Sequence, residues 1–255
     1  AVARRLGHAG LDVTAVERDA AALDVFAGLA RAAAARGLAA PIALDARAAD
    51  LDGLDLARLP TADLVLVGLA LNELFVDREA ADRLDAAEAW LRDLVGRLRP
   101  GGALVVLEPA LREPTRRLMR LRDRFADAGS PHVFAPCLRD GPCPLLARAR
   151  DWCHDVLPVE LPEALAALAA RAGLRGERLT YSYLTLRDDR SRLWDLAGRD
   201  PRAVRVVGGP TASKGKVEWD VCGAAGRTRL RRLARERSEA NAGLDAAPRG
   251  TVVRL

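Results

Sequence analysis

The sequence predicts an α/β fold of the Rossmann type, in which the strands of a mainly parallel sheet alternate with helices. Short apolar runs such as Asp63–Gly68 and Ala103–Leu107 suit strands that are buried on both faces. Longer stretches with helical periodicity lie between them, and Glu79–Leu98 is the clearest. Half of the 255 residues are hydrophobic, which is enough for a substantial core.

The first half of the chain contains the elements on which this prediction depends. In order, we expect the end of a helix over residues 1–8, strand Leu11–Val16, helix Ala20–Arg36, strand Pro41–Leu44, strand Asp63–Gly68, helix Glu79–Leu98 and strand Ala103–Leu107. Strands and helices at this spacing indicate βαβ units. We expect the chain to begin within the helix that follows the first strand of such a sheet, so that this strand is lacking here.

The second half of the chain is less regular. We expect helix Glu113–Ala126, an irregular stretch rich in Pro, Gly and Cys, helix Glu160–Ala172, strand Arg178–Leu186, strand Val217–Val221 and a basic helix after Ala225. The two strands are expected to form an antiparallel pair at the end of the sheet. The predicted division is a core over residues 1–129, a cysteine-rich metal-binding insertion over 130–158, the rest of the core over 159–225 and a basic extension over 226–255.

Polar side chains follow three consecutive predicted strands. Glu17 ends the first, Asp45 ends the second, and Asn72 and Glu73 follow the third. In open α/β sheets ligands bind at the carboxyl ends of the strands, where carboxylates can accept hydrogen bonds from a ribose or an adenine amino group. Each residue alone is more simply a solvated loop residue. Taken together, they predict a nucleotide-type pocket.

All four cysteines of the chain, Cys137, Cys143, Cys153 and Cys222, have the spacing Cys-x5-Cys-x9-Cys-x68-Cys. Buried free thiols are one interpretation, because cysteine packs as a small hydrophobic residue. Metal binding is favoured, since Cys137 and Cys143 lie in a Pro/Gly-rich loop with little core around it. Zinc usually binds closer Cys pairs, whereas wide spacing suits an iron–sulfur cluster. His132 or His154 in a Cys3His zinc site is a further alternative.

Basic residues are unevenly distributed along the chain. The net charge is +5, and the excess lies in Arg112–Arg124 and in Gly226–Arg237, where six of twelve residues are Arg. This asymmetry indicates either a polyanionic partner, most plausibly nucleic acid, or merely a solvated helix face, and nothing indicates DNA specificity. No signal peptide and no membrane-spanning apolar run is found. The arginine- and alanine-rich composition resembles that of bacterial proteins, so we expect a cytoplasmic bacterial protein.

The order of Glu17, Asp45 and Asn72-Glu73 along the chain resembles that of class I S-adenosylmethionine-dependent methyltransferases. The resemblance implies a methyltransferase-like sheet and a site for S-adenosylmethionine. In that family a glycine-rich loop after the first strand holds the cofactor, and Gly7-His8-Ala9-Gly10 does not replace it. The cofactor prediction therefore applies to the full-length protein. No residue is marked as a general base, so the catalytic residues are unknown and activity is uncertain.

The cysteine region resembles one family more specifically, the methyltransferase-like assembly factors of the small ribosomal subunit, known from mitochondria and with bacterial relatives. The segments that carry the resemblance are Leu71–Leu74, Ala135–Leu145, Asp151–His154, Tyr181–Leu184 and the late Cys222. It implies a 4Fe–4S cluster on the four cysteines and binding to the small subunit and its rRNA during assembly. The alternatives are an active rRNA methyltransferase and, more distantly, a zinc-stabilised small-molecule methyltransferase.

Overall fold

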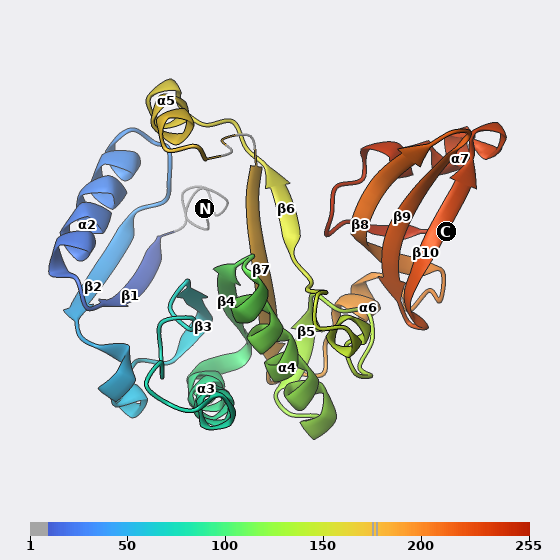
Figure 1. Cartoon of the computed structure of the whole chain (residues 1–255). Helices are drawn as coiled ribbons and strands as arrows, with labels where there is room; N and C mark the ends of the chain where they lie inside the picture. Colours follow the sequence, from blue (N-terminus) through green and yellow to red (C-terminus); the bar gives the residue numbers. More distant parts are fainter. Residues whose placement is uncertain (1–9, 175, 177) are drawn as a thin grey trace. The chain divides into compact units, whose positions relative to one another are not determined.

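The computed structural model describes residues 10–174, 176 and 178–255. The chain divides into two compact units, the N-terminal unit (Ala1–Thr61) and the C-terminal unit (Ala62–Leu255), whose elements are labelled in Figure 1. The helix end predicted over residues 1–8 lies outside the described residues. No described helix is both long and apolar enough to cross a membrane.

The N-terminal unit is one strand–helix–strand motif followed by two short turns. Its elements are β1 (Leu11–Glu17), α2 (Ala20–Ala35), β2 (Ile42–Ala48) and the 3-10 turns η1 (Leu51–Gly53) and η2 (Leu56–Arg58). The two strands pair in parallel, with Glu17 opposite Ala48, as expected for a βαβ unit. The Asp19 side chain accepts from the Ala21 N–H at 2.9 Å and so caps the first turn of α2. The predicted βα arrangement is confirmed here.

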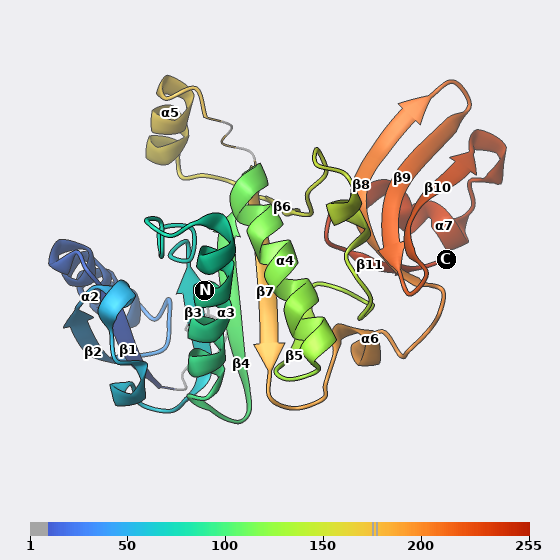
Figure 2. The same cartoon turned by 60° about the horizontal axis from the view of Figure 1, so that its bottom comes forward.

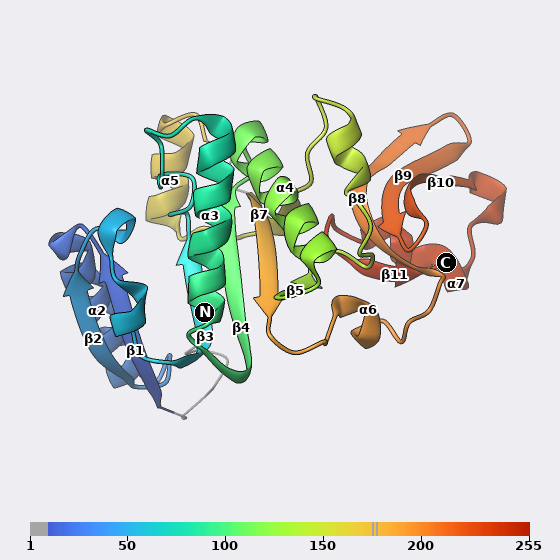
Figure 3. The ribbon, with the colours of Figure 1, turned by 90° about the horizontal axis from the view of Figure 1, so that it is seen from below.

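The C-terminal unit contains a mixed sheet with two long helices beside it. The strands are β3 (Ala62–Gly68), β4 (Leu98–Pro109), β5 (His132–Ala135), β6 (Asp155–Pro158) and β7 (Arg178–Arg187). Their order is β3-β4-β7-β5, with β6 also paired to β7; β3 and β4 are parallel, and β7 is antiparallel to its three partners. Helices α3 (Ala80–Val95) and α4 (Arg112–Ala128) pack along this sheet (Figures 2 and 3). The connections include α5 (Glu163–Arg171) and α6 (Leu193–Leu196).

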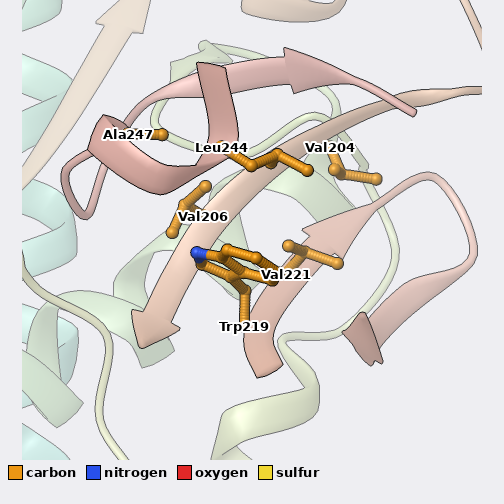
Figure 4. Close-up of a cluster of buried hydrophobic side chains, with 6 residues drawn as sticks. All are labelled: Val204, Val206, Trp219, Val221, Leu244 and Ala247. Carbon is orange, nitrogen blue, oxygen red and sulfur yellow. The ribbon is translucent and has the colours of Figure 1, made fainter. Parts of the chain in front are cut away.

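A second, fully antiparallel sheet ends the chain. Its elements are β8 (Ala203–Ser213), β9 (Lys216–Gly223), β10 (Gly226–Leu233), η4 (Ala234–Glu236), α7 (Glu239–Ala242), η5 (Gly243–Ala246) and β11 (Val252–Arg254), and the strand order is β10-β9-β8-β11. Trp219 and Val221 of β9 are fully buried and pack with Val206 and Leu244 (Figure 4). This core lies on one face of β9, so the alternate residues Asp220 and Cys222 point to the other face.

Two predictions for the second half of the chain are wrong. The segments Arg178–Leu186 and Val217–Val221 do form strands, but these belong to different sheets. The segment after Ala225 is the strand β10 and not a helix. Arginine is compatible with a helix, but Leu230 packs against the core of the second sheet, and Arg232 lies over the Trp219 ring at 5.1 Å. Tertiary packing therefore overrides local propensity.

Candidate functional site

The four cysteines line a single cavity of about 50 Å³ in the C-terminal unit. Cys137 lies just after β5, and Cys143 immediately precedes the 3-10 turn η3 (Pro144–Ala147). Cys153 lies two residues before β6, and Cys222 is in β9. The structure thus brings together three thiols from the irregular stretch and one thiol from the second sheet.

Buried arginines on one face of α4 hold the cysteine-bearing loops. Arg116 Nη1 donates to the backbone carbonyl of Asp151 at 2.7 Å. Almost two turns along the helix, Arg122 donates to the carbonyl of Gly141 at 2.6 Å and to that of Arg139. Arg116 is 7% exposed and Arg122 is 3% exposed. Each guanidinium therefore binds loop backbone that has few apolar side chains to anchor it.

The same helix face fixes the backbone at two of the thiols themselves. The Cys143 N–H donates to both carboxylate oxygens of Asp123, at 3.0 and 2.9 Å. The Cys153 N–H points to the Met119 sulfur at 3.4 Å. Arg122 is also bonded to Asp123, at 2.8 Å. Residues spaced three or four apart on one helix thus position Cys143 and Cys153.

The fourth thiol is positioned by strand register. Cys222 of β9 is paired with Arg205 of β8, and such cross-strand neighbours lie on the same face of a sheet. Arg205 is 4% exposed; its Nη1 is 3.5 Å from the Cys153 sulfur, and it forms a buried ion pair with Asp155. Arg205 therefore connects the second sheet to the loop that carries Cys153.

Burial favours the neutral form of three of the thiols, those of Cys137, Cys143 and Cys222. It raises the pKa of Cys143 to about 12 and that of Cys222 to about 11, and it also raises the pKa of Cys137. The guanidiniums of Arg122 and Arg205 act in the opposite direction on Cys137. Both guanidiniums are paired with carboxylates, Arg122 with Asp123 and Arg205 with Asp155.

Four thiol donors surround a space that is larger than a single water molecule needs. A cavity needs only about 10–15 Å³ to hold one water molecule, so about 50 Å³ leaves room for a larger group. Among the described residues, no three His, Cys, Asp or Glu side chains are arranged around one point as a single ion requires. In a cuboidal cluster each thiolate binds a different iron, so its ligands enclose a space. His154 lines the cavity, whereas His132 does not.

Of the two predicted nucleotide-site residues in the N-terminal unit, Glu17 lies at the end of its strand and Asp45 does not. Glu17 does end β1, and its carboxylate accepts from the Asp19 N–H at 3.1 Å. Asp45 does not end β2, because this strand continues to Ala48; Asp45 is paired with Arg47 at 2.8 Å. The predicted position of Asp45 is therefore wrong. Asp50, which the sequence interpretation passed over, follows β2 at the same end of the sheet as Glu17 and accepts from Asp52 N–H.

In the C-terminal unit, Asn72 and Glu73 lie in the loop after β3, as predicted. Asn72 Nδ2 donates to the Leu69 carbonyl at 2.7 Å, and Glu73 is exposed. Sequence reasoning missed Glu108, at the carboxyl end of β4, which is 1% exposed and has no hydrogen bond of normal geometry to either carboxylate oxygen within the described residues. Burial raises the pKa of Glu108 to about 7, although nearby Asn72 and Arg117 lower it in part.

The two basic stretches differ in how their arginines are used. In Arg112–Arg124, the buried Arg116 and Arg122 are bonded to loop carbonyls, so these two arginines are not available to a polyanionic partner. On β10, Arg229 and Arg231 are exposed on the face opposite the core. Arg229 pairs with Asp220 at 3.3 Å and remains 63% exposed. Arg229 and Arg231 are two residues apart on one exposed strand face, whereas the exposed Arg112 and Arg120 of the first stretch are eight residues apart.

A family model described as mitochondrial small ribosomal subunit Rsm22 matches residues 12–243. The chain belongs to this family. The match includes all four cysteines and both basic stretches of this Rsm22-family chain, and it confirms the resemblance inferred from the cysteine region. No curated protein gives a significant match.

Solved structures with some similarity include a methyltransferase and a decarboxylase. One is a precorrin-6y methyltransferase from Geobacter metallireducens, with 14% identity and a TM-score of 0.36, covering 74% of this chain and 84% of that chain. Another is a precorrin 8W decarboxylase from Methanobacterium thermoautotrophicum, with 16% identity and a TM-score of 0.35, covering 72% and 83%. Similarity at these TM-scores carries no argument about fold or activity.

Proposed function

We propose that this Rsm22-family protein binds the small ribosomal subunit through its rRNA in the bacterial cytoplasm. There it acts in the assembly of that subunit or in translation. Family membership over residues 12–243 is the observation that carries this proposal. The exposed arginines of β10 and of the turn after it, among them Arg229, Arg231 and Arg235, supply a surface for RNA phosphates. A methyltransferase-like architecture in this role provides a scaffold and does not itself require methyl transfer.

The proposal includes a 4Fe–4S cluster held by Cys137, Cys143, Cys153 and Cys222. The four thiols line one cavity, and buried guanidiniums lie beside it. Such a cluster would tie the loop that carries the first three cysteines to β9, so it would stabilise the fold. Zinc in the same place is the alternative, with His154 available if one thiol does not bind.

The first experiment is a visible absorption spectrum with iron, sulfide and zinc analysis on protein purified without oxygen. We expect a broad band near 400 nm with about four irons and four sulfides per chain. Cys222→Ser should remove the colour, whereas His132→Ala, a matched control outside the cavity, should retain it. Stoichiometric zinc without colour would replace the cluster by a zinc site. Absence of both metals would leave the cysteines as buried thiols and contradict this part of the proposal.

RNA binding is tested separately with small-subunit rRNA over a series of salt concentrations. Contacts from arginines to phosphates release counterions, so the logarithm of the binding constant should fall linearly with the logarithm of salt concentration. Binding that is absent, or independent of salt, would contradict the proposed function. Because this measurement does not depend on iron content, it separates a failure of RNA binding from a failure of the cluster assignment.

We also propose that the full-length protein has a site for S-adenosylmethionine. With this cofactor bound, the second candidate function is that of an active rRNA methyltransferase. Glu17 ends β1 at the same end of its sheet as Asp50, and a carboxylate there can accept hydrogen bonds from a ribose. Calorimetry with S-adenosylmethionine should detect binding, and Glu17→Ala should weaken it. No heat of binding with the full-length protein would contradict this proposal.

A further inference from the structure

A second and larger cavity lies in the C-terminal unit, with a volume of about 570 Å³. One wall is the loop over residues 137–141, and another is the segment over residues 190–199, which connects β7 to β8 and contains α6 (Figure 1). Cys137, Leu138 and Arg139 line both this cavity and the cysteine cavity. The volume falls within the range of roughly 300–1,000 Å³ that is usual for small-molecule sites.

The lining of this cavity is strongly basic. Four arginines line it, namely Arg139, Arg190, Arg192 and Arg199, together with two carboxylates, Asp140 and Asp195. Four guanidinium charges and two carboxylate charges line the cavity, so its lining has a net positive charge. Such a cavity attracts an anion, and planar guanidiniums match the oxygens of a phosphate.

The contacts of the two carboxylates show how the arginines are positioned. Asp195 accepts from Arg199 Nε at 2.7 Å and from the Arg192 N–H at 2.9 Å. Asp140 forms an ion pair with the Arg192 side chain, and this pair connects the cysteine-bearing loop to the segment that contains α6. The side chain of Arg199 stays 75% exposed. Arg192 and Arg199 are thus held in place by carboxylates, and Arg199 remains accessible to a ligand.

An indole ring lies among these charges. Trp194 lines the same cavity and is half-buried. Every nucleobase has a flat face that stacks on an aromatic ring, and an unpaired base on such a ring contributes about 1–3 kcal/mol. A phosphate ligand without a base, such as a phosphopeptide, would leave Trp194 without this partner. The combination of guanidiniums and an indole therefore favours a nucleotide over a simple anion.

We propose that this cavity binds one nucleotide of a single-stranded RNA segment, with its phosphate on the arginines and its base on Trp194. A nucleotide within a duplex cannot enter, because its base is paired and stacked. This inference rests on the proposed rRNA-binding function and specifies the form of RNA that is recognised. The site is separate from the exposed arginines of β10, whose contacts with phosphates do not depend on unpaired bases.

The test is fluorescence anisotropy with a labelled single-stranded RNA of about eight nucleotides, a usual length for such sites, and with the matching duplex. Trp194→Leu should weaken single-strand binding about tenfold, which corresponds to the loss of one stacked base, and Trp194→Phe should restore most of it. Arg190→Ala should weaken it as well. Arg99→Ala is the matched control, since Arg99 pairs with Asp63 and lines neither cavity. Duplex binding should be unchanged in all four variants.

The outcomes separate this inference from the proposed function. If the unmodified protein binds small-subunit rRNA but Trp194→Leu binds the single strand equally well, the cavity inference is overturned and the proposed function stands. Competition with cytidine monophosphate and inorganic phosphate gives a second test that uses the unmodified chain. Stronger competition by the nucleotide supports the inference. Equal competition would reduce the cavity to an anion site and overturn it.

Discussion

The arginines that fix the cysteine-bearing loops lie in one arginine-rich segment of this chain, and a row of exposed arginines lies in the other. In α4, Arg116 and Arg122 are buried and donate to backbone carbonyls of the cysteine-bearing loops. In β10, Arg229 and Arg231 alternate with core residues and face solvent. A count of basic residues therefore does not give the positive charge that is accessible to a partner. That charge depends on whether each guanidinium is buried or exposed.

The largest effect is expected from removing a buried guanidinium of α4. Arg122→Ala leaves the carbonyls of Arg139 and Gly141 without their donor, so unfolding in urea should show a loss of about 3 kcal/mol. Arg122→Lys should recover part of this, because a lysine is a donor without the planar fork. If Arg122→Ala unfolds at the same urea concentration as the unmodified chain, α4 does not hold the loop as described.

Glu108 extends the comparison to a buried carboxyl group. Its pKa of about 7 lies above the ordinary value near 4.5, so the stability that it contributes is full below pH 4.5 and is lost as the pH rises to about 7. Glu108→Gln should therefore raise the free energy of unfolding at pH 8 by up to about 3 kcal/mol and little at pH 4. Denaturant unfolding at both pH values checks this. An equal effect at both would show that Glu108 does not titrate in this range.

The smallest effect on stability is expected at the exposed arginines of β10. Arg229→Ala combined with Arg231→Ala should change the free energy of unfolding by no more than about 0.5–1 kcal/mol. The same variant should weaken binding to small-subunit rRNA and reduce the salt slope by about 2. Arg58→Ala is the control, since its side chain is 84% exposed in the N-terminal unit. If the control weakens binding as much as the β10 variant, the β10 face has no special role.

The sequence predicted those parts of the fold that depend on periodicity. The parallel strands β3 and β4 and the helices α3 and α4 appear where apolar runs and amphipathic stretches predicted them. The second sheet was not predicted, because pairing between β8, β9 and β10 is decided by partners that local propensity does not reveal. The position of Asp45 was missed for a similar reason, since pairing with β1 extends β2 beyond its apolar residues.

The candidate site was predictable only in part. The spacing of the cysteines selected four residues that line one cavity, although Cys222 is far from the others in sequence. Glu108 gave no signal beyond its place after an apolar run, and its burial is known only from the packing around β4. Trp194 and Arg199 lie in a segment without clear periodicity, so nothing in the sequence joined them to the loop of Cys137.

The place of Cys222 in β9 has a consequence for the order of events during synthesis. A chain is made from its N-terminus, so Cys137, Cys143 and Cys153 emerge well before Cys222. A site that uses all four thiols is completed only after β9 has been made and has paired with β8, which sets Cys222 opposite Arg205. Binding of a cluster at this site would then distinguish a finished chain from one that stopped short of its last sheet.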